Sequence, residues 1–326
     1  MVRMATPTWP GRRVLVTGGS GFLGRVVVAK LRQRGADVVA PRRAEYDLTD
    51  HGAAEQLFAD TRPEVVVHLA ARVGGIGYNQ DAPADLYLAN LLMGTHVIEA
   101  ARRHGVAKTV LVGTVCSYPK FTPVPFREET LWDGYPEETN APYSIAKKAL
   151  LVHAEVNRAQ HGQRSAFLIP TNLYGPGDKF HPAVSHVIPA LIKKCVEAVD
   201  AGDDKVEVWG TGRATREYLY VDDAAEGIVL AAELVDDPEP VNLGTDHEVS
   251  IRETVEHIAR LTGFKGELRW DPTKPDGQPR RRVDASRAEA LLGWRASMPF
   301  DEGLARTIEW YRANRAEAEA LPATTP

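Results

Sequence analysis

The stretch VLVTGGSGFLG, residues 14–24, decides the fold class that this chain is expected to adopt. The apolar run 14–17 is typical of a strand, the pattern 22–34 is typical of a helix, and glycines join the two. Glycine allows a tight turn and a close approach to the backbone, and the start of a helix presents free N–H groups. The G-x-x-G-x-x-G spacing therefore predicts a loop that holds the diphosphate of a dinucleotide. A glycine turn that serves only helix packing is the alternative.

Outward from this stretch, short β-branched runs alternate with longer helical patterns as far as Pro170. Further strands are expected at 37–40, 64–69, 109–112 and 164–169, and further helices at 51–60, 84–104, 143–161 and 222–234. This alternation predicts an α/β fold, a Rossmann-type doubly wound parallel sheet with a smaller mixed α/β C-terminal lobe. The dinucleotide-binding domain is expected to span residues 11–171 and about 217–244, and the substrate lobe 172–216 and 245–318.

The composition restricts the kinds of partner. The chain has 326 residues, a formal net charge of −5 and 44% hydrophobic residues, which is typical of a globular protein without a nucleic-acid or membrane surface. Its two cysteines, Cys116 and Cys195, cannot form a disulfide framework, and the N-terminus lacks the apolar segment of a signal peptide. No His, Cys, Asp or Glu cluster has the spacing of metal ligands. We expect a cytoplasmic protein with no membrane span, no nucleic-acid partner and no metal.

The end of the second expected strand indicates which dinucleotide is bound. An acidic residue there would favour the free 2′-hydroxyl of NAD, whereas arginine accommodates the 2′-phosphate of NADP. The sequence offers Arg42 and Arg43 and no acid before Glu45, so we predict NADP(H), with Arg43 as the leading contact. Two solvated surface arginines are the alternative. The other residues expected to line the cofactor site are Gly18, Gly21, Phe22, Leu23, Gly24, Asp47, Leu48, Leu69, Ala70, Ala71 and Lys147.

A Y-x-x-x-K pair marks the expected catalytic site. Tyr143 and Lys147 lie four residues apart, which places them on one face of a helix. We expect the ammonium to stabilise the phenolate and so to lower the pKa of Tyr143. Thr114 follows a predicted strand, at the sheet edge where such folds bind ligands, and its hydroxyl is expected to bind the substrate oxygen with Tyr143. Together with the glycine loop, these residues predict short-chain dehydrogenase chemistry.

Longer motifs make the sequence resemble one family, the GDP-L-fucose synthases, which are extended short-chain dehydrogenases. The similarity runs through about residues 12–312 and is densest in HLAARVGGI (68–76), VCSYPK (115–120), EETNAPYSIAK (137–147), PTNLYGPGDKFHPAVSHVIPALIKK (170–194), WGTGRATREYLYVDD (209–223) and KPDGQPR (274–280). The resemblance implies a homodimer that uses NADPH to epimerise and reduce GDP-4-keto-6-deoxy-D-mannose. Three positions depart from the family, since Thr114 and Val115 stand where its members usually have serine and Lys194 where they usually have arginine. The loop VTGGSGFLG is closer to the wider superfamily than to this family.

Residue roles follow from the resemblance position by position. Cys116 falls on the family's catalytic cysteine and His186 on its catalytic histidine. The residues that fall on, or are expected near, the nucleotide-sugar site are Asn172, His181, Val187, Lys194, Trp209, Arg216 and Lys274.

The chemistry of a 4-keto sugar explains why an epimerase would use Cys116 and His186 as an acid and a base. Hydrogens at C3 and C5, next to the carbonyl, are acidic enough for a positioned base to remove, and inversion needs an acid on the opposite face. By itself, each residue would more often be a buried structural group, as we expect for Cys195 and His68. Arg216 may be read as a diphosphate contact or as a partner of nearby carboxylates, and Arg280–Arg282 as a surface or domain-bridging run of charge.

Four alternatives to this function stay open from the sequence. The same machinery could act on another nucleotide-linked keto sugar, such as a GDP-6-deoxy-heptose, or could keep only one of the two activities. An epimerase or dehydratase that recycles bound NAD is a third reading. A non-catalytic dinucleotide sensor of this fold is the fourth, although such a protein has no need to keep both Tyr143 and Lys147.

Overall fold

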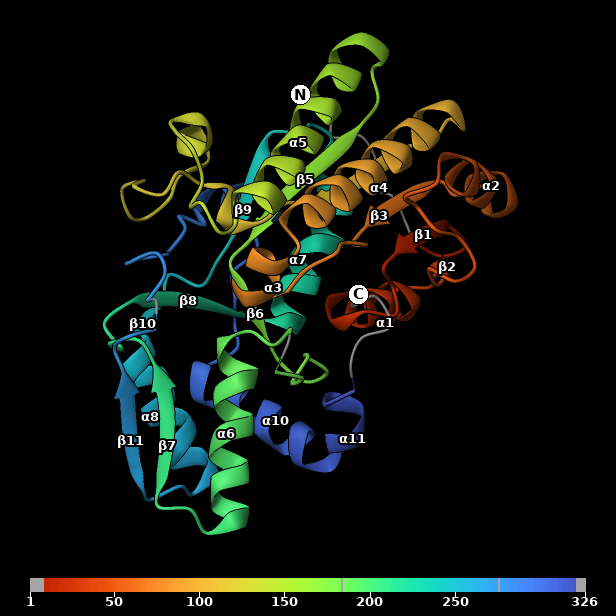
Figure 1. Ribbon diagram of the computed structural model, residues 1–326. Coiled ribbons are helices and arrows are strands. Elements are labelled where there is room, and N and C mark those ends of the chain that lie inside the picture. The colour runs from red at the N-terminus through yellow and green to blue at the C-terminus, as the bar shows by residue number, and fades with distance from the viewer. Residues whose placement is uncertain (1–8, 75, 183, 275, 321–326) are drawn as a thin grey trace.

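The computed structural model describes residues 9–74, 76–182, 184–274 and 276–320, and its centre is a six-stranded sheet (Figure 1). All neighbouring strands in this sheet are parallel. In spatial order the strands are β2 (Asp37–Val39), β1 (Arg13–Thr17), β3 (Val65–His68), β4 (Lys108–Val112), β5 (Ser165–Pro170) and β9 (Pro240–Leu243).

Helices cover both faces of the sheet, which confirms the predicted doubly wound fold. Successive strand side chains point to opposite faces, so Val14 and Val16 pack in one apolar cluster and Leu15 in another. One face carries α1 (Phe22–Gln33), α7 (Val221–Leu234) and α9 (Ser286–Leu292), and the other carries α2 (His51–Thr61), α4 (Pro83–Arg103) and α5 (Ala141–His161). Among the described residues, no helix combines the length and the apolar composition that a membrane span needs.

Most of the chain after β5, apart from α7, β9 and α9, builds a second layer of structure, in the lower part of Figure 1, around its own apolar core. Strands β6 (Asn172–Tyr174), β8 (Thr215–Tyr220) and β10 (Glu248–Ser250) form one small sheet, and β7 (Lys205–Trp209) pairs in parallel with β11 (Glu267–Asp271). The helices here are α6 (Val187–Ala201), α8 (Ile251–Thr262), α10 (Phe300–Ala313) and α11 (Arg315–Ala318). The short α3 (Ile76–Asp81) and the 3-10 turns η1 (Val115–Ser117) and η2 (Glu128–Trp132) complete the described elements.

The strand order changes direction between β1 and β3. The chain leaves β1 for β2 on one side and returns to β3 on the other, where Thr17 and His68 pair in register. In open parallel sheets, ligands bind outside the carboxyl ends of the strands at such a switch point. The glycine loop after β1 and the residues after β3 and β4 therefore belong to the edge of the sheet that is expected to carry the site.

Candidate active site

The loop between β1 and α1 has the backbone shape that a diphosphate requires. Gly18 has φ +71°, and a side-chain carbon there would lie 2.7 Å from the backbone nitrogen of Ala70, while one at Gly24 would overlap the Gly18 carbonyl oxygen. Gly21 is the N-cap of α1, and no side-chain hydrogen bond caps this end of the helix. The first N–H groups of α1 can therefore bind an anion, and the loop fits a dinucleotide.

The two arginines beyond β2 lie at the surface. Glu45, the first acid in this segment, accepts a hydrogen bond from the backbone N–H of Arg42 at 2.6 Å. The guanidinium of Arg43 pairs with Asp47 at 3.1 Å, and both side chains of this pair are partly exposed. Glu45 therefore bonds to backbone rather than to a guanidinium, whereas Asp47 pairs with Arg43. The remaining predicted cofactor residues, Leu48, Leu69, Ala70 and Ala71, are buried or half-buried.

Tyr143 lies in the first turn of α5, and Lys147 follows one turn later on the same face. The Lys147 Nζ is 5.9 Å from the centre of the Tyr143 ring. Lys147 is 3% exposed, and burial lowers its pKa to about 8. Burial, followed by the neighbouring Cys116 thiol, raises the pKa of Tyr143. The predicted lowering of the Tyr143 pKa is therefore wrong, because burial disfavours the charged phenolate.

Thr114 and Cys116 follow β4 at the same edge of the sheet. Thr114 is the N-cap of η1, and its Oγ1 accepts a hydrogen bond from the backbone N–H of Cys116 at 3.2 Å. This short turn holds the cysteine beside Tyr143, whose pKa the thiol raises. Thr114, Cys116, Tyr143 and Lys147 are thus grouped at one place, from β4 and α5.

Arg281 is a site residue that the sequence analysis missed. Its Nη1 lies 3.4 Å from the Cys116 Sγ and 3.5 Å from the Asn172 Oδ1, and the residue is 8% exposed. Of the two readings of Arg280–Arg282, the solvated one is wrong for Arg281, whose contacts with Cys116 and Asn172 fit the bridging one, while Arg280 is exposed and pairs with Glu248. Adjacent residues of an extended segment point to opposite sides, so the sequence RRR hides one inward arginine between its neighbours.

His186 is the N-cap residue of α6, and the charge of Arg281 acts on its imidazole. It is open to solvent, but the protein atoms around it desolvate the imidazole, and the charges of Lys179 and Arg281 add to this effect. Together they lower the pKa of His186 to about 4, so the ring is neutral at neutral pH. Since Arg281 also contacts Cys116, the predicted acid and base lie around one guanidinium. His181 and Val187 flank His186 in the chain.

Arg216 on β8 points at backbone carbonyls rather than at the carboxylates considered for it. Its guanidinium donates to the carbonyl oxygens of Thr215 and Gln278, both at 2.7 Å, and of Asp276 at 3.2 Å. The alternative pairing with neighbouring carboxylates is therefore wrong. Burial, followed by the charge of Arg281, lowers the pKa of Arg216 to about 10, so it stays cationic at neutral pH.

An exposed tryptophan at the end of β7 has two lysines beside it. Trp209, at the end of β7, is 59% exposed. The Nζ atoms of Lys194 and Lys274 lie 5.6 Å and 5.3 Å from the centre of a ring of its side chain. An aromatic face between cations suits a planar base that carries phosphate groups. The structure thus brings Lys194, Trp209 and Lys274 together, as the resemblance predicts.

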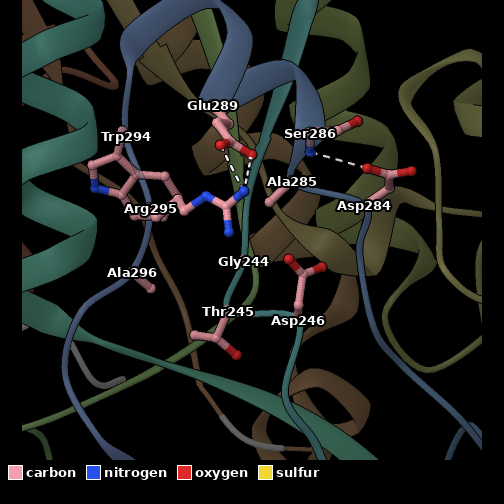
Figure 2. A pocket seen from close by; sticks show the side chains of 10 residues that line it. All are labelled: Gly244, Thr245, Asp246, Asp284, Ala285, Ser286, Glu289, Trp294, Arg295 and Ala296. Carbon is pink, nitrogen blue, oxygen red and sulfur yellow. Dashed lines mark hydrogen bonds and ion pairs between the residues drawn. The ribbon is translucent and has the colours of Figure 1, made fainter.

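A separate hollow of about 160 Å³ has none of the predicted site residues in its wall (Figure 2). Asp246, Asp284 and Glu289 line it, and its one arginine, Arg295, is paired with Glu289. Its acidic wall and its volume, below the several hundred Å³ of a usual ligand site, do not suit a nucleotide sugar. No set of three His, Cys, Asp or Glu side chains in the described part of the chain is arranged to hold a metal ion.

Comparisons with known proteins extend over nearly the whole chain. A sequence model of the NAD dependent epimerase/dehydratase family matches residues 14–244. GDP-L-fucose synthase 1 of Arabidopsis thaliana is 43% identical over 303 residues, which cover 93% of this chain and 94% of that protein. Among solved structures, a GDP-L-fucose synthetase from Naegleria fowleri bound to NADP is 28% identical, with a TM-score of 0.87 and coverage of 97% and 98%. A GDP-6-OMe-4-keto-L-xylo-heptose reductase from C. jejuni is 26% identical, with a TM-score of 0.88 and coverage of 93% and 98%. The resemblance predicted from the motifs is confirmed.

Proposed function

Because this chain belongs to the NAD dependent epimerase/dehydratase family, we propose that it is an NADPH-dependent epimerase and reductase of a GDP-linked 4-keto-6-deoxy sugar. The substrate that we favour is GDP-4-keto-6-deoxy-D-mannose, and the product is GDP-L-fucose, after the activity in the names of its relatives. One observation carries the proposal: a thiol, Cys116, lies against a guanidinium and beside the tyrosine of a Tyr–Lys pair. A simple reductase needs the pair but has no use for the thiol.

Epimerisation uses Cys116 and His186 in this proposal. A guanidinium 3.4 Å from the sulfur stabilises a thiolate, which takes a proton from C3 or C5 of the sugar. Thr114 and Tyr143 donate hydrogen bonds to the carbonyl oxygen and stabilise the enolate. His186 delivers a proton to the opposite face, for which it must first be protonated. Burial is the larger cause of the lowered pKa of His186, and the negative charge of the substrate diphosphate offsets only the smaller effect of Lys179 and Arg281.

Reduction uses Tyr143 and Lys147. When bound, NADPH supplies the hydride that is added to C4 of the sugar. Tyr143 donates the proton to the C4 oxygen. Burial raises the pKa of this phenol, which keeps it protonated before the step. The ammonium of Lys147 stabilises the negative charge that the phenol acquires as its proton leaves. Reduction is therefore expected to weaken above about pH 8, where Lys147 loses its charge.

The positive residues at the edge of the second layer are proposed to hold the nucleotide. Arg216 and Lys194 supply charge for the diphosphate, and Trp209 stacks on the base. Asn172 and His181 are assigned to the sugar. At the other end of the site, the loop around Gly18 holds the cofactor diphosphate, and Arg42 and Arg43 hold the 2′-phosphate; the relative from Naegleria fowleri binds NADP.

We also propose that the protein is a homodimer that acts in the cytoplasm. Large apolar side chains are exposed along α4 and α5, which pack side by side on one face of the sheet (Figure 1). They are Tyr87 at 38%, Leu88 at 53%, Val152 at 42% and Val156 at 51% exposure. Such a face is costly to leave in water and suits a second copy of the chain. Both cysteines are free thiols, as a reducing compartment requires.

The deciding experiment is to incubate the protein with NADPH and a panel of GDP- and dTDP-linked 4-keto-6-deoxy sugars, and to identify the products by NMR. GDP-L-fucose is expected from the mannose derivative. Conversion of a GDP-keto-heptose alone would instead favour the second candidate, which the structural likeness to a heptose reductase supports. A product without net NADPH consumption would indicate an epimerase that recycles its cofactor. If the protein binds NADPH but forms no product from any sugar, the non-catalytic dinucleotide sensor is the remaining alternative.

A further inference from the structure

His68 is a buried histidine that the proposed chemistry does not use. It is the last residue of β3 and is 1% exposed. It pairs in register with Thr17 on β1 and with Leu111 on β4. The Nδ1 lies 2.8 Å from the Thr17 Oγ1, whereas the Nε2 is buried and has no hydrogen-bond partner among the described residues. A buried ring nitrogen without a hydrogen-bond partner destabilises the fold, so we expect a ligand, a water molecule or a neighbouring side chain that moves to supply one.

The side of the sheet on which His68 lies also carries the catalytic helix. Leu111, its neighbour on β4, packs in one apolar cluster with Leu150 and Leu151 of α5. Lys147 precedes these residues on α5 and lies close enough for its charge to affect the imidazole. Burial, followed by that charge, lowers the pKa of His68 to about 3, so the ring is neutral.

The hydrogen bonds of Thr17 indicate which nitrogen carries the proton. The Thr17 Oγ1 accepts a hydrogen bond from the backbone N–H of Ala70 at 3.3 Å and keeps a second lone pair for the ring. With the proton on Nδ1, that nitrogen donates to Thr17, and the lone pair of Nε2 is free for a cation. With the proton on Nε2, a buried N–H would face a positive charge without an acceptor. Electrostatics favours the first tautomer.

We propose that His68 is a positioning residue for Lys147, whose ammonium donates a hydrogen bond to the Nε2 either directly or through one water. The chain of contacts is then Thr17, His68, Lys147 and Tyr143. Since Thr17 immediately precedes Gly18, the same residues tie the catalytic lysine to the loop assigned to the cofactor. His68 thus keeps Lys147 charged and aimed at the phenol. The kinetic part of this inference rests on the proposed function, and the structural part does not.

The structural part is tested on the protein without cofactor or substrate. Nitrogen-15 NMR of histidine-labelled protein reports the tautomer of each ring, and the His68→Asn spectrum identifies the signals of His68. We expect a neutral ring with the proton on Nδ1 from pH 5.5 to 8. A proton on Nε2, or an imidazolium in this range, would overturn the proposal whatever the enzyme's substrate is.

Two substitutions separate positioning from packing. The amide of Asn occupies the place of Nδ1 and keeps the bond to Thr17, whereas the amide oxygen of Gln reaches the place of Nε2 and can accept from Lys147. Carbon-13 NMR of labelled lysine, with Lys147→Arg to identify the signal, follows the titration of Lys147. We expect His68→Asn to lower that pKa by about 1 unit, the loss of one hydrogen bond to a charged group, and His68→Gln to restore it.

The pH dependence of the reduction rate should change in the same variants as the pKa of Lys147. The alkaline limb is expected to move down by about 1 pH unit in His68→Asn and to return in His68→Gln. Equal titration of Lys147 in both variants and the wild type would overturn the proposal, even if the variants lost thermal stability. If the variants do not fold, the tautomer of the wild-type ring still decides.

Discussion

Cys116 and Tyr143 lie close together but act on different bonds of the proposed substrate, so substitutions should separate the two activities. Cys116→Ser removes the base, and solvent deuterium exchange at C3 and C5 is expected to fall by about 10²–10⁴-fold while some direct reduction of the unepimerised sugar persists. Tyr143→Phe removes the proton donor, and reduction should fall by a similar factor while some exchange remains. NMR of the sugar in D₂O measures both. Normal exchange in Cys116→Ser, or equal loss of both activities in both variants, would contradict this division of roles.

Arg281 offers a second separation, because its neighbour is a matched control. Arg281→Gln removes the charge beside the Cys116 sulfur, and we expect exchange and the alkylation of Cys116 by iodoacetamide to slow by about 10–100-fold. Arg280→Gln removes an arginine that pairs with Glu248 at the surface and should change neither rate. Mass spectrometry of the alkylated peptide gives the rate directly, since Cys195 is fully buried. Unchanged alkylation in Arg281→Gln would show that the guanidinium does not stabilise the thiolate.

At the scale of single residues, the sequence predicted side chains that a motif identifies, and missed those that only the third dimension selects. Tyr143 and Lys147 could be predicted because a fixed spacing on a helix places both on one face. Arg281 could not, since three consecutive arginines look alike until the direction of the chain is known. The pKa of Tyr143 was expected to fall and instead rises, because burial cannot be read from a Y-x-x-x-K pattern.

Among elements, five strands of the central sheet could be predicted, whereas its sixth strand, β9, and most of the second layer were missed. The β-branched run of β3 is buried on both faces and is unmistakable. By contrast, β11 is mostly polar and becomes a strand only by pairing with β7, from 62 residues earlier in the chain. In β7, polar and apolar residues alternate along the sequence KVEVW, and burial alternates with them. This alternation is a sequence signal that predicts one strand of the pair.

The segment between β2 and α2 decides the choice of cofactor, and it can be tested as an element. Arg42→Ala combined with Arg43→Ala removes both guanidiniums beyond the end of β2. We expect kcat/KM for NADPH to fall by about 10–100-fold, from the loss of charge-assisted bonds to the 2′-phosphate, and the value for NADH to change little.

A control for this prediction exists on α10. Arg306 forms an exposed pair with Glu302 four residues away, as Arg43 does with Asp47. Arg306→Ala should therefore leave the preference between NADPH and NADH unchanged. A wild-type enzyme that prefers NADH, or an equal loss with both cofactors in the double variant, would contradict the assignment.

Across the whole molecule, one buried carboxylate connects the parts that carry the site. Glu217 on β8 is fully buried, and its side chain accepts hydrogen bonds from the backbone N–H groups of Thr245, Asp246 and Val283. Its own carbonyl oxygen accepts from Thr171 and Asn172. Val283 lies two residues after Arg281, so this carboxylate fixes the segment that brings the guanidinium to Cys116. The site thus depends on segments from both halves of the chain.

The exposed apolar face of α4 and α5 gives the last test, since α5 also carries Tyr143, the proposed proton donor, in its first turn. If a second copy covers this face, then Leu88→Glu and Val156→Glu each place a charge in an apolar interface, which is costly without a partner. We expect the wild type to have about twice the chain mass of 35.7 kDa in light scattering, and each variant to have the mass of one chain. Val199→Glu, at a similarly exposed apolar position on α6, is the control and should stay dimeric. Dimers in both variants would show that the interface lies elsewhere on the molecule. A monomeric wild type would contradict the proposed dimer. Because one of the two interface helices, α5, holds Tyr143 and Lys147, we further expect the monomers to bind NADPH but to reduce the sugar more slowly.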